Sequence, residues 1–221
     1  MSVLLAIETA SIPGSVAVRD PDGAISELTL GIGARERALA ADVRALISAR
    51  GGPAAVAGVA LSIGPGSFTG LRLGLSFVKG FCLAFPVPVV GVSTLRAMAE
   101  GAARAHPDSR TLLALVDARG GEVYAAAFGR GDGTLCADER VPEGAYAAGF
   151  APDLGDALVF GTGVDLVKAR PSGWTVCPRG LWTPSAGMVG EIGWPQLLLG
   201  QGLSADDLEP RYLTRPKFDR V

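Results

Sequence analysis

The sequence contains a single histidine, His106, among its 221 residues. With one histidine, neither an HxxxH nor an HExxH metal pair can form. A Ser-His-Asp triad would have to use His106, which lies beside Pro107 in a predicted hinge with no nucleophile elbow near it. The sequence therefore argues against a zinc hydrolase and against a serine hydrolase.

Cysteine is also scarce, and the net charge is small. The three cysteines, Cys82, Cys136 and Cys177, are scattered without a CxxC pair, so we expect no metal site and a reducing, cytoplasmic location. The 20 basic and 22 acidic residues leave a formal net charge of −2. Such a chain lacks the positive surface that binds nucleic acid without help from a partner.

Long uninterrupted apolar runs are missing as well. The longest apolar region, residues 70–92, contains Arg72, Lys79, Pro86 and Pro88, which makes it a poor membrane span. The apolar run at the N-terminus has no basic flank and is interrupted by Glu8, so we expect no signal peptide. We therefore expect no association with a membrane.

The most informative stretch is the glycine-rich segment 62–70, Ser-Ile-Gly-Pro-Gly-Ser-Phe-Thr-Gly. A Val-rich run at 56–61 precedes it and an apolar run at 71–85 follows it, which predicts a strand, a glycine loop and a buried helix. Ser67 or Thr69 can cap the helix, whose free N–H groups would favour an anion. The alternative is a tight turn that only lets the strand and the helix pack closely.

The chain repeats one unit after about half its length. Residues 3–8, 15–19 and 24–30 read as a three-stranded meander, and residues 112–117, 122–128 and 134–141 read as a second one. This predicts an α/β fold of two duplicated lobes, residues 1–105 and a smaller lobe 106–221 whose last segment packs back toward the first. Each copy places a carboxylate, Glu8 or Asp117, at the end of its first strand. The two carboxylates either face each other across the cleft between lobes or accept N–H bonds from their own turns.

The remaining segments are assigned by the same signals. The apolar stripe Leu39, Val43, Leu46 and Ile47 predicts a helix over 35–50, and Ser93 caps a helix over 94–105. A second glycine turn lies at 161–163, a helix broken near Pro195 is expected over 184–200, and the region 142–156 reads as a loop or weak helix. The segment 209–221 is locally basic, with a solvated tail as the default and a docking segment as the alternative.

The stretch Gly64-Pro-Gly-Ser-Phe-Thr-Gly-Leu-Arg-Leu-Gly74 closely resembles the signature of the bacterial TsaB (YeaZ) family. The resemblance continues at residues 5–10, 91–95, 117–124 and 210–215, and so spans nearly the whole chain. It implies an actin-like fold (ASKHA, RNase H-like) of two lobes with mixed sheets flanked by helices, a type also labelled peptidase M22-like or glycoprotease-like.

The resemblance also implies a function in tRNA processing. It points to a non-catalytic scaffold and activator in the complex that makes N6-threonylcarbamoyladenosine at position 37 of tRNAs decoding ANN codons. The implied partners are a catalytic TsaD-like paralogue that carries an HxxxH metal site, a TsaE-like ATPase, and tRNA reached through the complex. No tightly bound cofactor or metal and no catalytic residue is expected, ATP or ADP is expected only at the assembled complex, and the isolated chain is expected to pair with itself.

Two sets of site residues follow. The candidate anion or nucleotide contacts of the cleft are Glu8, Thr9, Gly64, Gly66, Ser67, Thr69, Asp117, Gly161 and Gly163. Surplus apolar surface on the first-lobe helices, and the room left by Gly70 and Gly74 for another helix, predict the partner interface. Its candidate residues are Ala38, Leu39, Ala41, Asp42, Ala45, Gly70, Leu71, Gly74 and Val78.

Two departures from the family pattern weaken ligand binding by this chain. Glu8 stands where the family often has Asp, and its longer side chain would crowd a phosphate loop; Arg37 stands in the place of a histidine. The competing functions are a stand-alone ATP-binding phosphotransferase of actin-like fold and a glycoprotease-like peptidase. Nothing in the sequence supplies a peptidase mechanism.

Overall fold

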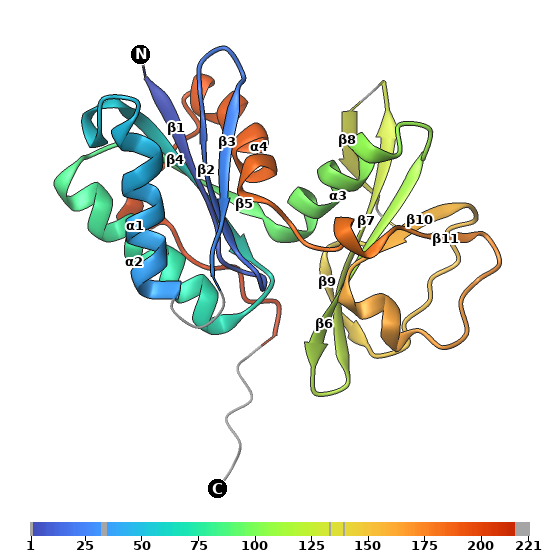
Figure 1. Cartoon of the computed structure of the whole chain (residues 1–221). Helices are drawn as coiled ribbons and strands as arrows, with labels where there is room; N and C mark the ends of the chain where they lie inside the picture. Colours follow the sequence, from blue (N-terminus) through green and yellow to red (C-terminus); the bar gives the residue numbers. More distant parts are fainter. Residues whose placement is uncertain (1, 32–34, 133, 139, 215–221) are drawn as a thin grey trace, which may run out of the picture.

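The structure, a computed structural model, describes residues 2–31, 35–132, 134–138 and 140–214, and of residues 35–38 the backbone alone. Figure 1 shows two lobes, each built on its own sheet. The first sheet contains β1 (Val3–Glu8), β2 (Ser15–Arg19), β3 (Ile25–Thr29), β4 (Val56–Gly64) and β5 (Val89–Ser93). The second contains β6 (Thr111–Arg119), β7 (Glu122–Gly131), β8 (Thr134–Ala137), β10 (Ala157–Phe160) and β11 (Trp174–Val176), with β9 (Gly144–Ala147) paired to β7.

The two sheets have the same topology. The first runs β3-β2-β1-β4-β5 and the second, read from its other edge, runs β8-β7-β6-β10-β11. In both, an antiparallel meander is followed by parallel strands: β1 pairs with β4, and β6 with β10, in parallel. The predicted duplication and the mixed α/β fold class are confirmed.

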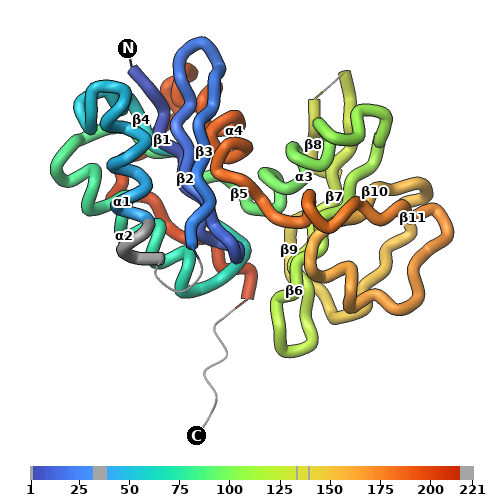
Figure 2. The backbone as a smooth tube through the Cα atoms, viewed as in Figure 1, coloured from blue at the N-terminus to red at the C-terminus, as the bar shows by residue number. Residues whose placement is uncertain are grey.

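The first sheet is covered on both faces. Val3, Leu5 and Ile7 face α1 (Arg35–Ser48) and α2 (Phe68–Ala84), whereas Leu4 and Ala6 face α4 (Ala186–Leu198). This period of two explains why β1 is an unbroken apolar run with every side chain buried. Figure 2 shows α1 and α2 side by side on one face, with α4 on the other.

Helix α4 joins the first sheet although it comes from the end of the chain. Gly190 lies against Ala6, and Gly193 lies against Ala60. Carboxylate oxygens of Glu27 accept the N–H groups of Ala186 (2.9 Å) and Gly187 (3.2 Å) at the start of the helix. Glycine disfavours the interior of a helix, but Gly190 and Gly193 have no side chain and therefore let α4 lie close to the sheet.

Helix α3 (Thr94–Ala105) lies between the lobes. Ser93 caps it as expected, since Ser93 Oγ accepts the N–H of Arg96 at 3.3 Å. Leu95, Met98 and Ala102 pack into the core of the second lobe, whereas Ala97 packs with α4 in the first. Different side chains of α3 therefore belong to the cores of the two lobes.

Short 3₁₀ helices complete the chain, at Pro53–Ala55 (η1), Thr162–Leu166 (η2), Arg179–Leu181 (η3) and Ala205–Asp207 (η4). None of the helices in the described residues has the length and apolar character needed to span a membrane.

Two expectations about the second half are wrong. Residues 144–147 form β9 rather than part of a loop or weak helix, because β7 offers its edge to this Gly-Ala-Tyr-Ala segment. Helix α4 also continues through Pro195 to Leu198. Trp194 and Leu197 pack against the first lobe on either side of the proline, and this packing outweighs the lost N–H.

We expect Gly193→Ala to destabilise the protein by about 1–3 kcal/mol, because the new Cβ would lie 2.6 Å from Ala60 Cβ and force α4 off the sheet. Gly101→Ala on α3 is the matched control, since its Cβ would meet only Met188 Cγ at 3.7 Å. Urea unfolding should leave that control unchanged or stabilise it by up to about 1 kcal/mol. Equal effects of the two substitutions would contradict the close packing of α4.

Candidate functional site

The glycine loop joins β4 to α2 as the sequence predicts. Gly64 has a φ of +111°, a conformation that favours glycine. Ser67 caps α2, since its Oγ accepts the N–H of Gly70 at 3.2 Å, and the Ser67 N–H donates to the carbonyl of Ala10 at 2.8 Å. The loop is therefore tied to the turn that follows β1.

The room left by the loop glycines is filled by the chain itself. A Cβ on Gly66 would lie 2.5 Å from the Ala10 carbonyl oxygen, and one on Gly70 would overlap the carbonyl oxygen of Thr9. A Cβ on Gly74 would meet the Thr9 hydroxyl and, at 2.9 Å, Leu61. These contacts favour the interpretation of the loop as a tight packing turn. They also show that our reading of Gly70 and Gly74 as room for a partner helix is wrong, because both glycines face the inside of the lobe.

Glu8, at the end of β1, is completely buried. Its carboxylate accepts three hydrogen bonds from the first lobe: from Ser11 Oγ (2.7 Å), from Ser11 N (3.1 Å) and from Ser62 Oγ (3.3 Å). Burial raises the pKa of Glu8 from 4.5 to about 7, although the bonds from Ser11 and Ser62 lower it in part. The donors at this strand end are thus occupied by a carboxylate of the chain itself.

Thr9 follows Glu8 and is also buried. Its hydroxyl has no hydrogen-bond partner within the described residues and lies against Gly74 rather than in an open cleft. Thr69, by contrast, is exposed at the start of α2. The predicted contacts of the first lobe therefore come from both buried and exposed positions and do not form one surface.

Asp117, the equivalent of Glu8 in the second lobe, is exposed. Its Oδ1 accepts the N–H of Arg119 at 2.7 Å inside the β6–β7 hairpin, where Arg119 has a φ of +61°. Our hypothesis of two carboxylates facing each other across the cleft is wrong, because Glu8 has no exposed surface. The alternative, a carboxylate that accepts N–H bonds from its own turn, describes both residues.

The second glycine turn is built like the first. Gly161 has a φ of +101°, and a Cβ on it would overlap the Leu115 carbonyl oxygen. A Cβ on Gly163 would lie 2.9 Å from the carbonyl carbon of Leu115. Thr162, between these two glycines, accepts the N–H of Asp117 on its Oγ1 at 3.0 Å. Both turns therefore pack closely on their own lobe, the first on the residues that follow β1 and the second on the middle of β6.

The predicted interface residues divide into two groups. Leu39, Leu71 and Val78 belong to the buried core, together with the two glycines already described. Ala41 and Ala45 are exposed on α1, and Asp42 is half-buried. The side chain of Ala38 lies outside the residues that the structure describes.

Sequence reasoning missed a group of residues between the lobes. Glu143, before β9, forms an ion pair with Arg211 (3.2 Å) and accepts a hydrogen bond from Ser93 Oγ (2.9 Å). Burial raises the pKa of Glu143. The sequence signal was the resemblance of residues 210–215 to the family, but sequence alone could not show that this segment reaches the second lobe.

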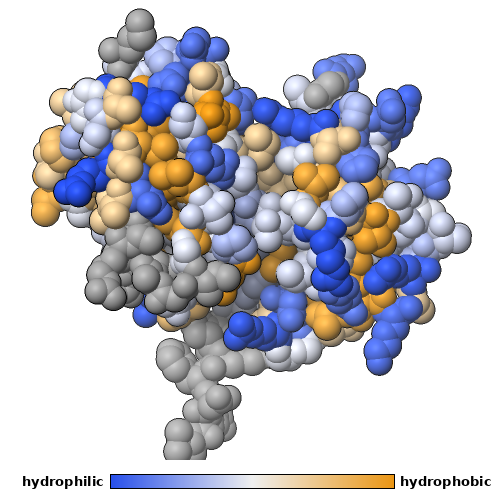
Figure 3. Space-filling view, in the orientation of Figure 1, coloured by the Kyte–Doolittle hydropathy of each residue, from blue (hydrophilic) through white to orange (hydrophobic). Residues whose placement is uncertain are grey.

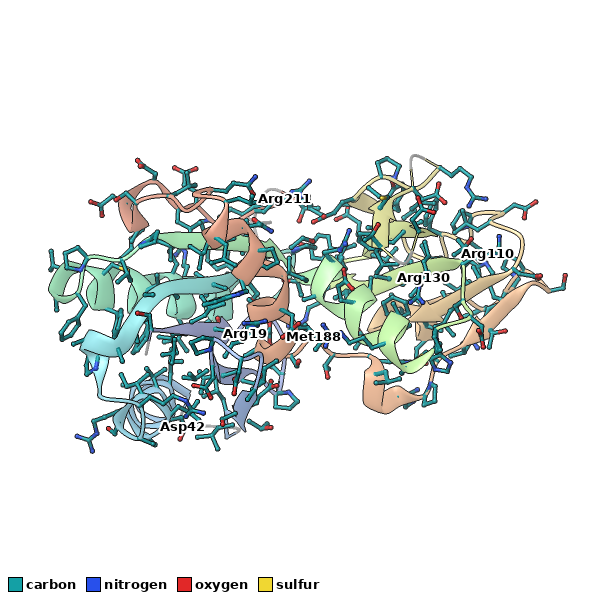
Figure 4. The ribbon with its side chains drawn as sticks, turned by 90° about the horizontal axis from the view of Figure 1, so that it is seen from above. Arg19, Asp42, Arg110, Arg130, Met188 and Arg211 are labelled. Atoms are coloured by element: carbon teal, nitrogen blue, oxygen red, sulfur yellow. The ribbon has the colours of Figure 1, made fainter. Side chains whose placement is uncertain are left out.

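The described residues contain no group of three or more histidine, cysteine or acidic side chains placed to hold a metal ion. One hollow, of about 500 Å³, lies between the lobes and is lined by residues that include Glu27, Arg104, Thr183 and Met188. Figure 4 labels Met188 at this junction. Arg104 is already paired with Glu191 at 2.9 Å.

The raised pKa of Glu8 predicts a stability that depends on pH. Between pH 4.5 and about 7 the folded chain holds a proton that the unfolded chain loses, so the free energy of unfolding should fall as pH rises. We expect Glu8→Gln to remove a decline of about 2–3 kcal/mol between pH 5 and pH 8. Urea unfolding of both proteins at the two pH values measures it; parallel pH dependence of the wild type and the variant would refute the assignment.

Comparisons with known proteins identify the family. Residues 35–153 match the sequence model of a family described as "TsaD: tRNA N6-adenosine threonylcarbamoyltransferase". The tRNA threonylcarbamoyladenosine biosynthesis protein TsaB of Escherichia coli is 33% identical over 163 residues, which are 68% of this chain and 67% of that protein.

Two solved structures from Pseudomonas aeruginosa match nearly the whole chain. One, an uncharacterized protein with similarity to peptidase YeaZ, has a TM-score of 0.82 at 27% identity and covers 97% of this chain and 100% of its own. The other, YeaZ, has a TM-score of 0.81 at 28% identity and covers 96% and 100%. The chain therefore belongs to the TsaB family of tRNA threonylcarbamoyladenosine biosynthesis proteins.

Proposed function

We propose that the chain is a non-catalytic subunit that binds and activates a catalytic TsaD-like paralogue in the synthesis of threonylcarbamoyladenosine on tRNA. The observation that carries the proposal is the burial of Glu8, whose carboxylate uses the Ser11 and Ser62 donors at the end of β1. A strand-end carboxylate held in this way is not available to a metal ion, a nucleotide phosphate or a substrate.

The alternative is catalysis by the chain itself, which the match to a transferase family model favours. The family resemblance assigns an HxxxH metal pair to the catalytic paralogue, and this sequence has only His106. Asp117 is held by its own hairpin, and the described residues of the second lobe contain no group of acidic, histidine or cysteine side chains that could replace that pair. These features support the role of a partner over that of a catalyst.

The outer face of α1 and α2 is the surface we propose for the paralogue. Ala41 and Ala45 are exposed there on α1. On α2, Leu73, Phe77 and Phe81 are half-buried, so they pack in part against the core of the first lobe and remain in part accessible. Apolar side chains are visible on the first lobe around α1 and the far end of α2 in Figure 3. Small exposed residues beside half-buried apolar ones suit the close packing of another helix.

The same face can pair with a second copy when the paralogue is absent. A TsaE-like ATPase and tRNA join through the assembled complex, which is also where ATP or ADP binds. We place this complex in the cytoplasm. The net charge of −2 fits a subunit that leaves most contacts with tRNA to its partners.

We expect Ala41→Glu combined with Ala45→Glu to weaken binding of the catalytic paralogue by at least about a hundredfold, because the complex would bury unpaired charges. The melting temperature of the isolated chain should change little, since both positions are exposed. Size-exclusion chromatography and isothermal titration with the purified paralogue measure the effect.

Ala147→Glu is the matched control, because Ala147 is exposed on β9 in the other lobe. It should bind the paralogue like the wild type. Wild-type affinity of the α1 double variant would place the interface elsewhere. Gly74→Arg is unsuitable for this test, because Thr9 and Leu61 fill the space beside Gly74.

A further inference from the structure

The segment 209–214 leaves the core of the first lobe at Leu208, which is 3% exposed. Beyond that point it runs along the C-terminal end of β4 and the N-terminal end of α2. The Arg211 N–H donates to the Ile63 carbonyl at 2.7 Å, and its own carbonyl oxygen occupies the space that a Cβ on Gly64 would need. The ring of Tyr212 lies 5.4 Å from that of Phe68, the first residue of α2.

The same segment also reaches the second lobe. The Arg211 guanidinium forms an ion pair with Glu143 at 3.2 Å. The same carboxylate accepts a hydrogen bond from Ser93 Oγ at 2.9 Å. Three residues further along, Thr214 Oγ1 lies 3.0 Å from the Tyr124 hydroxyl of β7. Figure 4 shows Arg211 between the two lobes. The segment is therefore a bridge whose two ends are attached to different lobes.

The two faces of the first sheet meet the second lobe differently. On the α4 face, α3 packs into the cores of both lobes, so apolar side chains join them. On the α2 face, residues 209–214 contact the second lobe through the ion pair Arg211–Glu143 and the hydrogen bond between Thr214 and Tyr124. The apolar packing of α3 can therefore act as a hinge between the lobes, while the weaker polar contacts on the other side can break and reform.

We propose that residues 209–214 are a releasable strap that holds the second lobe against the first, with the pair Glu143–Arg211 as its latch. None of these six residues is buried, and each contact changes an equilibrium by only about two- to tenfold. The strap can therefore detach beyond Leu208 without unfolding either lobe. Its release lets the lobes move apart about α3.

The pair Glu143–Arg211 is sensitive to the loss of either partner because the side chain of Glu143 is mostly buried. Its Oε1 has no hydrogen-bond partner within the described residues, and its Oε2 depends on Arg211 and Ser93. Loss of Arg211 leaves a carboxylate that is better hydrated away from the first lobe. We infer that the latch opens at Glu143 and that the rest of the strap follows.

The test measures the distance between lobes with two spin labels on the full chain. Cys136 is exposed on β8, and Ala54→Cys supplies an exposed site on η1 of the first lobe; Cys82 and Cys177, both buried, are replaced by alanine. We expect Arg211→Ala to widen the distance distribution toward longer values. Hydrogen exchange of the Arg211 amide in Glu143→Gln should accelerate about two- to fivefold, the factor that corresponds to loss of a partly exposed ion pair.

Arg140→Ala is the matched control. Arg140 and Asp138 form a pair inside the second lobe with side chains 52% and 13% exposed, close to the 48% and 14% of Arg211 and Glu143. The control should leave the distance distribution unchanged, and the exchanged pair Glu143→Arg with Arg211→Glu should restore it. Unchanged distances in Arg211→Ala, or the same widening in the control, would overturn the strap.

Discussion

The close approach of the glycine loop to the end of β1 is the constraint on which the first lobe depends. The carbonyl oxygens of Thr9 and Ala10 occupy the positions that side chains at Gly70 and Gly66 would take. This contact sets α2 against β1 and closes the lobe over Glu8. A buried carboxylate with three donors from its own lobe then remains at the end of β1.

The second lobe repeats the close packing of a glycine turn, but its carboxylate is not buried. Gly161 and Gly163 pack closely on Leu115 within β6, as the first loop packs on the residues that follow β1. Asp117 nevertheless remains exposed and is used in a hairpin turn. The same backbone arrangement has thus been kept in both lobes while their carboxylates have different environments, which fits a chain that keeps the fold without a paired acidic site.

Local patterns were sufficient to predict most of the fold. The period of the apolar residues, the Ser93 cap and the strand–loop–helix at 56–85 could all be inferred from neighbouring residues, and the repeat made the two-lobed topology predictable. The continuation of α4 through Pro195 and the pairing of β9 with β7 depend on contacts between distant segments, which no local pattern contains. The same reason explains the error at Gly70 and Gly74: their spacing predicts a smooth helix face, but only the fold shows that Thr9 fills it. The residues between the lobes, Glu143 and Arg211, are 68 positions apart and could not be paired from the sequence.

We propose that this chain supports a catalytic partner and does no nucleotide chemistry of its own. Isothermal titration of the isolated chain with Mg-ATP, followed by analysis of the mixture for ADP, tests it most directly. The occupied donors around Glu8 predict no heat beyond dilution and no ADP above the rate in buffer. Micromolar binding accompanied by turnover would contradict the account and identify the chain as a phosphotransferase.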